Sequence, residues 1–138
     1  MPAKDVYHET CKNALIKDGW TVTHDPLFLY WNERKSYVDL GAEKTLAAEK
    51  SGRKIAVEIK SFLGPSEMFD LEQALGQFIL YRLAMQREHP DRELYLAIPE
   101  TVYLSLFTEP DGTDLIEVAD LRMIVFDPDS EEIRLWVP

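Results

Sequence analysis

Residues 53–62, RKIAVEIKSF, carry the pattern that most constrains how this chain can fold. The β-branched residues of this segment recur at every second position: Ile55, Val57 and Ile59. This spacing predicts a β-strand with one apolar face. Glu58 and Lys60 share the opposite face. Because two residues of a strand span about 7 Å, a carboxylate and an ammonium project side by side from one surface of the predicted sheet.

Glu58 and Lys60 in this arrangement match the Glu-x-Lys half of a nuclease signature, in which an upstream Asp completes a divalent-metal site. Hydrolysis of a phosphodiester uses a hard cation, Mg²⁺ or Mn²⁺, which is bound by one or two carboxylates together with phosphate and water. Asp39 precedes the strand and is the expected partner of Glu58. Lys60 is expected to orient the attacking water and to balance charge in the transition state. A solvent-facing Glu-x-Lys pair on an ordinary strand is the alternative.

A second acidic residue competes with Asp39 for the role of metal ligand. Residues 43–49, EKTLAAE, predict a partner strand, and residues 50–53, KSGR, predict the turn of a hairpin. Counting residue pairs across this turn places Glu43 nearer to Lys60 than Asp39 is, so a bulge or loop has to carry Asp39 inward. The sequence therefore leaves both Asp39 and Glu43 as candidates.

A long helix is predicted from Ser66 to about Glu88, with acidic residues in its first turn. Its expected apolar stripe consists of Leu71, Ala74, Leu75, Phe78, Ile79 and Leu83. A neighbouring polar stripe holds Gln73, Gln77 and Tyr81 at four-residue steps, so Gln77 and Tyr81 are adjacent in space. A Gln-x-x-x-Tyr pair on the helix that follows the Glu-x-Lys strand is the accessory motif of one nuclease subgroup, in which the amide and phenol contact substrate or brace the site. A half-buried helix edge with solvated polar tips is the alternative.

The remaining segments predict an α/β scaffold around these motifs. The expected elements are a helix at residues 4–18, strands at 20–23 and 94–98, and a terminal hairpin at 123–126 and 133–137. His8, at the edge of the apolar face of the first helix, is either a further active-site candidate or a hydrogen-bonded histidine at the core boundary. A chain of 138 residues without a long linker is expected to form one domain, residues 1–138.

The formal net charge of −10 opposes simple binding to a polyanion, because nonspecific DNA affinity depends on neutralising phosphates with Lys and Arg. The charge is unevenly placed. Residues 1–61 carry ten Lys or Arg against nine Asp or Glu, whereas residues 62–138 carry five against sixteen. Every lysine lies at or before Lys60, so nucleic acid is expected to approach the first half of the chain. The acidic half is either a solvated surface or a docking surface for a basic partner protein.

No apolar run approaches the roughly 18 residues that a membrane span requires, and the start of the chain leads directly into a charged amphipathic segment. A protein without contact to a membrane is therefore expected. The single cysteine, Cys11, cannot form an internal disulfide, which favours a reducing cytoplasm. Its place on the apolar side of the first helix predicts a small core residue rather than a nucleophile.

Three blocks of the sequence resemble the XisH family, known as the fdxN element excision controlling factor proteins. They are KNALIKDGWTVTHDPL from Lys12, VDLGAEKTLAAEKSGRKIAVEIKSFLG from Val38 and LEQALGQFILYR from Leu71. The resemblance covers essentially the whole chain. It implies a restriction-endonuclease-like fold of the PD-(D/E)xK superfamily, with a mixed central β-sheet flanked by helices. It also implies a cyanobacterial cytoplasmic setting and a role in controlling excision of a DNA element from a nitrogen-fixation gene during heterocyst development.

The resemblance further implies a functional partner, an XisI-type protein, while strand exchange belongs to a separate site-specific recombinase. The superfamily motif falls on Asp39, Glu58 and Lys60, and the helix motif on Gln77 and Tyr81. Val38 stands where the motif has Pro, which keeps Glu43 in competition with Asp39.

Two functions from different classes follow from these observations. The first is a metal-dependent DNA endonuclease, which the three signature side chains favour. The second is a regulatory subunit without catalysis, which uses a nuclease-derived fold to bind DNA or protein and which the net charge favours. A homodimer is expected only with the acidic halves of the two copies kept apart, because dimerisation doubles the negative charge.

Overall fold

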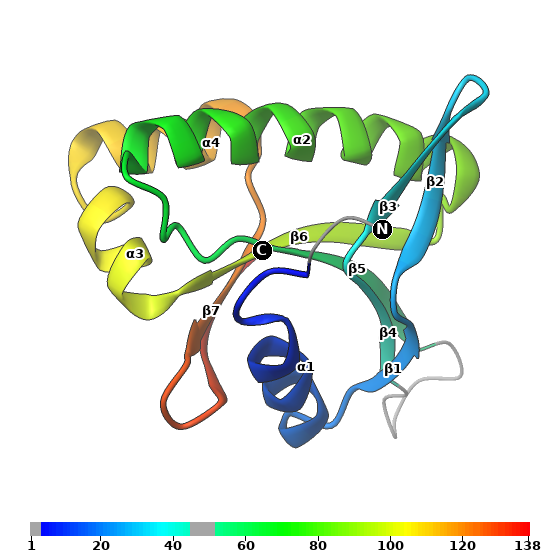
Figure 1. Cartoon of the computed structure of the whole chain (residues 1–138), viewed down its shortest axis with the longest axis horizontal. Coiled ribbons are helices and arrows are strands. Elements are labelled where there is room, and N and C mark those ends of the chain that lie inside the picture. The colour runs from blue at the N-terminus through cyan, green and yellow to red at the C-terminus, as the bar shows by residue number, and fades with distance from the viewer. Residues whose placement is uncertain (1–3, 45–51) are drawn as a thin grey trace.

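The computed structural model describes residues 4–44 and 52–138, and the central element of this part of the chain is a six-stranded sheet (Figure 1). In spatial order its strands are β1 (Thr21–His24), β4 (Leu40–Lys44), β5 (Arg53–Ile59), β6 (Arg92–Pro99), β7 (Met123–Asp127) and β8 (Glu132–Val137). The pairs β5/β6 and β6/β7 are parallel, whereas β1/β4, β4/β5 and β7/β8 are antiparallel. The predicted mixed sheet is therefore confirmed.

Helices cover both faces of this sheet. In the described residues they are α1 (His8–Lys17), α2 (Glu67–Glu88), α3 (Glu100–Leu106) and α4 (Pro110–Ala119). Figure 1 shows α1 on one side of the sheet and α2 crossing the other side. Each face has its own apolar cluster: Cys11, Leu15 and Trp20 belong to the α1 side, whereas Leu71 and Phe78 belong to the α2 side. The prediction of an α/β fold is confirmed.

The alternation of side chains along β5 determines the face of the sheet on which Glu58 lies. Ile55, Val57 and Ile59 belong to the apolar cluster on the α1 side, as expected from their period of two. Glu58 therefore projects toward the α2 side. Pairing continues one residue beyond the strand, because the Lys60 N–H donates to the carbonyl of Ala97 at 3.0 Å. Both members of the Glu-x-Lys pair thus face the layer that contains α2.

Helix α2 agrees with its prediction at both ends. Ser66 is the N-cap residue, and its side chain accepts a hydrogen bond from the Phe69 N–H at 3.2 Å. The expected apolar stripe is wrong in its second half, because Ile79 and Leu83 are exposed, while Ala84 and Met85 are buried in their place. The buried stripe drifts around the helix, which is 22 residues long, and leaves apolar residues on its outer surface.

Two predicted boundaries are also wrong. The first helix begins at His8 instead of Lys4, because Asp5 accepts the Tyr7 N–H with its carboxylate and forms a turn before the helix. The strand before β5 begins at Leu40 instead of Glu43. Residues 45–51, which include most of the predicted strand and part of its turn, lie outside the described residues.

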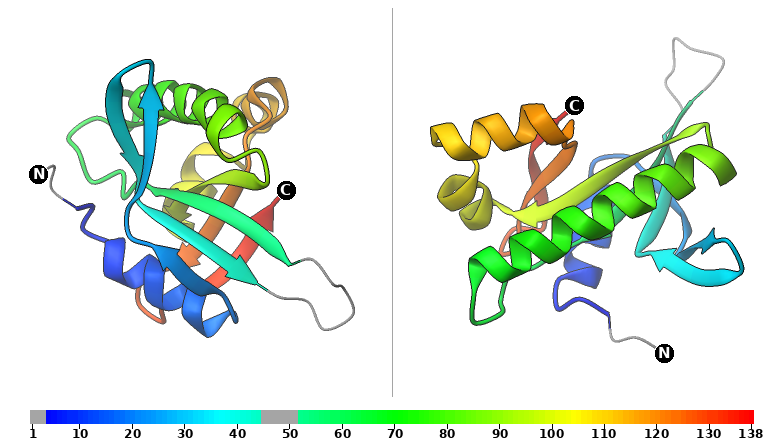
Figure 2. Two further views of the ribbon diagram at one scale, coloured as in Figure 1. Left: turned by 90° about the vertical axis from the view of Figure 1, so that its right-hand side faces the viewer. Right: turned by 90° about the horizontal axis from the view of Figure 1, so that it is seen from above.

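Three features were not predicted from the sequence: helices α3 and α4 and a separate hairpin, β2 (Leu27–Trp31) with β3 (Arg34–Val38). Its two-residue turn begins at Asn32, which adopts a positive φ of 54°. Figure 2 shows this hairpin standing away from the main sheet beside α2. The chain passes directly from β3 into β4 through Asp39, so the hairpin leads to the candidate site.

No helix in residues 4–44 and 52–138 combines the length and the apolar character that crossing a membrane requires.

Candidate active site

Asp39 and Glu58 lie side by side although 18 residues separate them in the sequence. Leu40 pairs with Val57 in the antiparallel ladder of β4 and β5, so the preceding Asp39 comes opposite Glu58. Asp39 Oδ2 accepts a hydrogen bond from the Ile59 N–H at 2.8 Å, which fixes the direction of its carboxylate. Both acidic side chains are buried, with 8% of Asp39 and 6% of Glu58 exposed.

When two carboxyl groups lie side by side in a buried place, ionisation of both at once is unfavourable. Burial raises the pKa of Glu58 well above its ordinary value, and the hydrogen bond and negative charge of Asp39 raise it further. The positive charge of Lys60 opposes this shift. A carboxyl group held in its neutral form by burial and a like-charged neighbour is typical of sites that bind a cation or move a proton.

A hollow of about 180 Å³ opens over the two carboxylates. Its lining consists of Asp5, Tyr37, Asp39, Glu58, Ile59, Lys60, Gln77 and Tyr81. Five residues predicted from the sequence therefore meet at one place, from β5, α2 and the β3–β4 junction. Gln77 Oε1 is buried there without a hydrogen-bond partner among the described residues. A buried acceptor of this kind is costly unless water or a ligand satisfies it.

Tyr37 and Asp5 also line the hollow but were not predicted from the sequence. Burial raises the pKa of Tyr37, and the negative charges of Asp39 and Glu58 raise it further. Asp5 Oδ2 accepts the Ser61 N–H at 3.0 Å and so holds the backbone beside Lys60. Neither residue carries a local sequence signal, because each reaches the site through tertiary contacts.

Gln73 lies beside the hollow instead of within it. It lines a neighbouring depression of about 180 Å³, to which Lys60 and Asp5 also contribute. The polar stripe on α2 therefore follows the site, with Gln77 and Tyr81 at the carboxylates and Gln73 one turn earlier.

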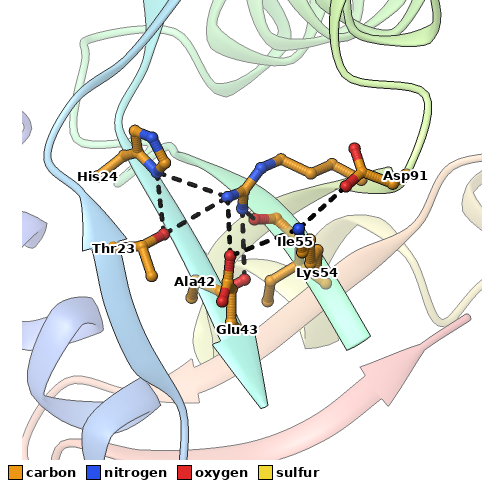
Figure 3. Close-up of polar contacts among 8 residues, drawn as sticks. Thr23, His24, Ala42, Glu43, Lys54, Ile55 and Asp91 are labelled. Atoms are coloured by element: carbon orange, nitrogen blue, oxygen red, sulfur yellow. Dashed lines mark hydrogen bonds and ion pairs between the residues drawn. The ribbon is translucent and has the colours of Figure 1, made fainter. Parts of the chain in front are cut away.

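Glu43 is placed elsewhere. In the antiparallel ladder Glu43 pairs with Lys54, six residues before Lys60. The expectation that Glu43 lies nearer to Lys60 than Asp39 does is therefore wrong. The Glu43 carboxylate lies 3.5 Å from the Arg92 guanidinium and 3.9 Å from the Lys54 ammonium. Figure 3 shows this cluster, where Glu43, Thr23 and Lys54 gather at the far end of the β4–β5 ladder.

His8 is also absent from the residues that line the hollow. It is 3% exposed, and its Nε2 lies 2.7 Å from Asp25 Oδ1. Lys12 donates to Asp25 Oδ2 at 2.8 Å. His8, Glu9 and Asp25 lie within reach of one metal ion, but the Lys12 ammonium already neutralises the Asp25 carboxylate. The arrangement matches the prediction of a hydrogen-bonded histidine at the core boundary.

Cys11 is fully buried on the α1 side, and burial raises the pKa of its thiol, which favours a core role over a nucleophilic one.

Comparison with known proteins identifies the family. The model of the XisH protein family matches residues 1–134. The chain belongs to the XisH family. A crystal structure of an XisH family protein from Nostoc punctiforme PCC 73102 has 39% sequence identity and a TM-score of 0.86, and the match covers 97% of this chain and 100% of that one.

A crystal structure of an fdxN element excision controlling factor protein from Anabaena variabilis has 40% identity and a TM-score of 0.86. That match covers 98% of this chain and 100% of the A. variabilis chain. The search of curated proteins gives no match. The resemblance inferred from the three sequence blocks is therefore confirmed at the level of the XisH family.

Proposed function

We propose that this XisH family member is a metal-dependent DNA endonuclease with a restriction-endonuclease-like core, in which Asp39 and Glu58 hold Mg²⁺ or Mn²⁺. The observation that carries the proposal is the convergence of two buried carboxylates with Lys60 in one hollow. Asp39 comes from the β3–β4 junction, Glu58 from β5 and Lys60 from the residue that follows β5, so their meeting depends on the pairing of β4 with β5.

The donor set fits a hard divalent cation. Asp39 and Glu58 supply carboxylate oxygens, which Mg²⁺ and Mn²⁺ prefer, and the hollow leaves room for water and a phosphate. Burial raises the pKa of Glu58, and the hydrogen bond and negative charge of Asp39 raise it further, so a cation between the two carboxylates would take over the role of the proton. When bound, the cation supplies polarisation of the scissile phosphate and a more acidic water.

The protein residues have separate roles in this proposal. Asp39 is oriented by the Ile59 N–H and lines the hollow. Lys60, on the same face as Glu58, orients the attacking water and balances negative charge on the phosphate. Gln77 and Tyr81 contact the DNA backbone or brace the carboxylates, and the unpartnered Gln77 Oε1 supports a contact with ligand or water. Asp5 keeps the backbone after Lys60 in place.

The biological setting is proposed from the relatives. The A. variabilis protein is described as an fdxN element excision controlling factor, so we propose that this chain acts in programmed excision of a DNA element. An XisI-type protein is the proposed partner. A homodimer would allow both strands to be cut, provided that the acidic halves stay apart.

A regulatory subunit without catalysis is the second candidate, and the net charge of −10 favours it. In that case the hollow binds DNA or a metal ion without cleaving, and the partner protein supplies the positive charge that phosphate binding needs.

Cleavage of supercoiled plasmid and of branched DNA with Mg²⁺ or Mn²⁺ distinguishes the two functions. The proposal expects cleavage by the wild type, loss of cleavage in Glu58→Gln, and retention in Glu43→Gln, the matched change in the carboxylate at the far end of the ladder. Equal cleavage by the wild type and Glu58→Gln overturns the endonuclease assignment. Absence of cleavage by the wild type with its XisI-type partner favours the regulatory subunit.

A further inference from the structure

The β2–β3 hairpin exposes three aromatic side chains. Phe28, Tyr30 and Trp31 are 45%, 48% and 37% exposed. Exposed aromatic side chains gathered on one element are typical of a binding surface. The hairpin is firmly placed, because Glu88 at the end of α2 accepts the Tyr30 N–H at 2.9 Å. Because successive strand residues point to opposite faces, Phe28 and Tyr30 lie on one face of the hairpin and Trp31 lies on the other. We call the β2–β3 hairpin with these three residues the aromatic hairpin.

A hollow of about 160 Å³ lies between the aromatic hairpin and α2. Tyr30 and Trp31 line it from β2, and Leu80, Tyr81 and Ala84 line it from α2. Its walls are almost entirely apolar, which suits the flat face of an aromatic ring system.

Tyr81 connects this hollow to the candidate active site. Its side chain lines both the apolar hollow and the hollow over Asp39 and Glu58. Ser36 in β3 donates to the Tyr81 hydroxyl at 3.4 Å, which ties the hairpin to this shared wall. A ligand in the apolar hollow is therefore a direct neighbour of a phosphate held by the carboxylate site.

Positive charge accompanies the aromatic surface. The Lys35 ammonium lies 3.9 Å from the centre of the Phe28 ring, and the Arg87 guanidinium lies 5.9 Å from that of Trp31. Arg34 and Lys35 outnumber the single acidic residue between Leu27 and Val38, in a chain of net charge −10. Aromatic faces with flanking cations are the combination that binds single-stranded nucleic acid, because bases stack and phosphates pair with the cations.

We propose that the aromatic hairpin binds an unpaired nucleotide of the DNA, with the base stacked on Trp31 in the apolar hollow and a phosphate near Arg87. The proposal rests on the endonuclease function and names its substrate class: DNA with unpaired nucleotides, such as a flap, a branch point or a single strand. In a continuous duplex each base is stacked and paired, so entering the hollow requires an unfavourable extrusion. An unpaired base avoids this cost.

Binding without cleavage tests the proposal. With chelator present and at low salt, the anisotropy of a labelled deoxythymidine oligonucleotide gives the affinity of each variant. Trp31→Ala is expected to weaken binding about tenfold, the effect of losing one stacked base. Trp31→Phe restores most of the affinity, since a ring remains. Binding to a blunt duplex is expected to be weaker and unchanged by either substitution. Ile16→Ala, an exposed apolar residue on α1 across the sheet, is the matched control and leaves binding unchanged.

Tryptophan fluorescence gives a second readout. Trp20 is 3% exposed and packs against Trp136 with ring centroids 5.5 Å apart, so Trp31 is the reporter on the aromatic hairpin. The oligonucleotide is expected to quench the wild type and to quench Trp31→Phe much less. Equal affinity of wild type and Trp31→Ala for the oligonucleotide overturns the proposal. So does a change from dimer to monomer in Trp31→Ala by analytical ultracentrifugation, since the aromatic hairpin is then an interface between copies.

These outcomes are independent of catalysis. Loss of the endonuclease assignment follows from equal cleavage by wild type and Glu58→Gln, whereas loss of the nucleotide site follows from the Trp31 variants in chelator.

Discussion

Asp39, at the junction of β3 and β4, lies opposite Glu58 of β5, and the Ile59 N–H that follows Glu58 donates to the Asp39 carboxylate at 2.8 Å. The same backbone segment thus positions both acids. Two buried carboxylates at this separation repel when both are ionised, and the raised pKa of Glu58 expresses that repulsion together with burial. Binding of a cation or a proton removes this repulsion, so the stability of the folded protein depends on both pH and metal binding.

Lys60→Ala is expected to abolish or greatly reduce cleavage of plasmid or branched DNA with Mg²⁺ or Mn²⁺. Removing one group that stabilises transition-state charge typically lowers the rate by about 100-fold or more. The fold should persist, because Lys60 faces the hollow and lies outside both apolar clusters. Lys54→Ala is the matched control, since this lysine lies on the same strand but forms ion pairs with Glu43 and Asp91. Equal rates for wild type and Lys60→Ala contradict the assignment and indicate another site or a contaminant.

Mg²⁺ or Mn²⁺ is expected to raise the melting temperature of the wild type, because a ligand that binds only the folded state stabilises it by mass action. At a metal concentration 100-fold above Kd the gain is about 2.7 kcal/mol. Asp39→Asn should remove the effect while keeping an oxygen that accepts the Ile59 N–H. Glu43→Gln should retain most of it. Retention of the shift in Asp39→Asn contradicts the assignment of Asp39 as a metal ligand.

Without metal, Glu58 is expected to make the protein less stable as the pH rises. Its folded-state pKa is raised above the ordinary value of 4.5, so the folded state holds the proton to higher pH than the unfolded chain does. The stabilisation is fully present below the pKa of the unfolded chain and is lost as the pH rises through the raised folded-state pKa. Melting temperatures in chelator, measured from about pH 4 upward, check this.

The melting temperature of the wild type is compared with that of Glu58→Gln at each pH, because the other carboxylates change the stability of both proteins with pH. The melting temperature of the wild type minus that of Glu58→Gln should fall as the pH rises. If the melting temperature of the wild type instead rises relative to that of Glu58→Gln over the same pH range, the folded-state pKa of Glu58 is not raised.

The sequence predicted the elements whose signals are local. The alternation in β5 and the Ser66 cap of α2 lie within single segments, so the apolar face of β5 and the start of α2 agree with the structure. Helices α3 and α4 were missed because neither N-cap residue, Pro99 or Glu109, caps its helix with a side chain, although Pro110 at the start of α4 is a local signal. The β2–β3 turn at Asn32 has no glycine after the asparagine and escaped detection for that reason.

The candidate site was predicted in its residue types but not in its geometry. A tight turn after residue 49 brought Glu43 toward Lys60 in the sequence count, whereas the observed register pairs Glu43 with Lys54. The register of β4 against β5 determines whether Asp39 or Glu43 lies near Glu58, and the local sequence does not specify that register. Asp5 is 56 residues from Ser61, whose N–H it accepts, so its contribution follows only from the packing of the N-terminal turn against β5.

The isolated protein is expected to bind DNA weakly and with a steep dependence on salt, and an XisI-type partner is expected to strengthen binding or to form a stable complex with it. The first 61 residues carry a net charge of +1 and the remainder −11, so few phosphates can be neutralised and long-range repulsion slows association. Gel-shift titrations at fixed low salt, with and without the partner, measure this.

The Lys35→Ala variant sharpens the experiment, because this lysine flanks the aromatic hairpin and should contribute to phosphate binding both with and without the partner. Its loss should reduce the slope of log affinity against log salt by about one unit or less, as for one phosphate contact. Tight binding by the protein alone at moderate salt contradicts the prediction. In that case the basic residues of the first half outweigh the total charge, and the electrostatic reason for requiring a partner disappears.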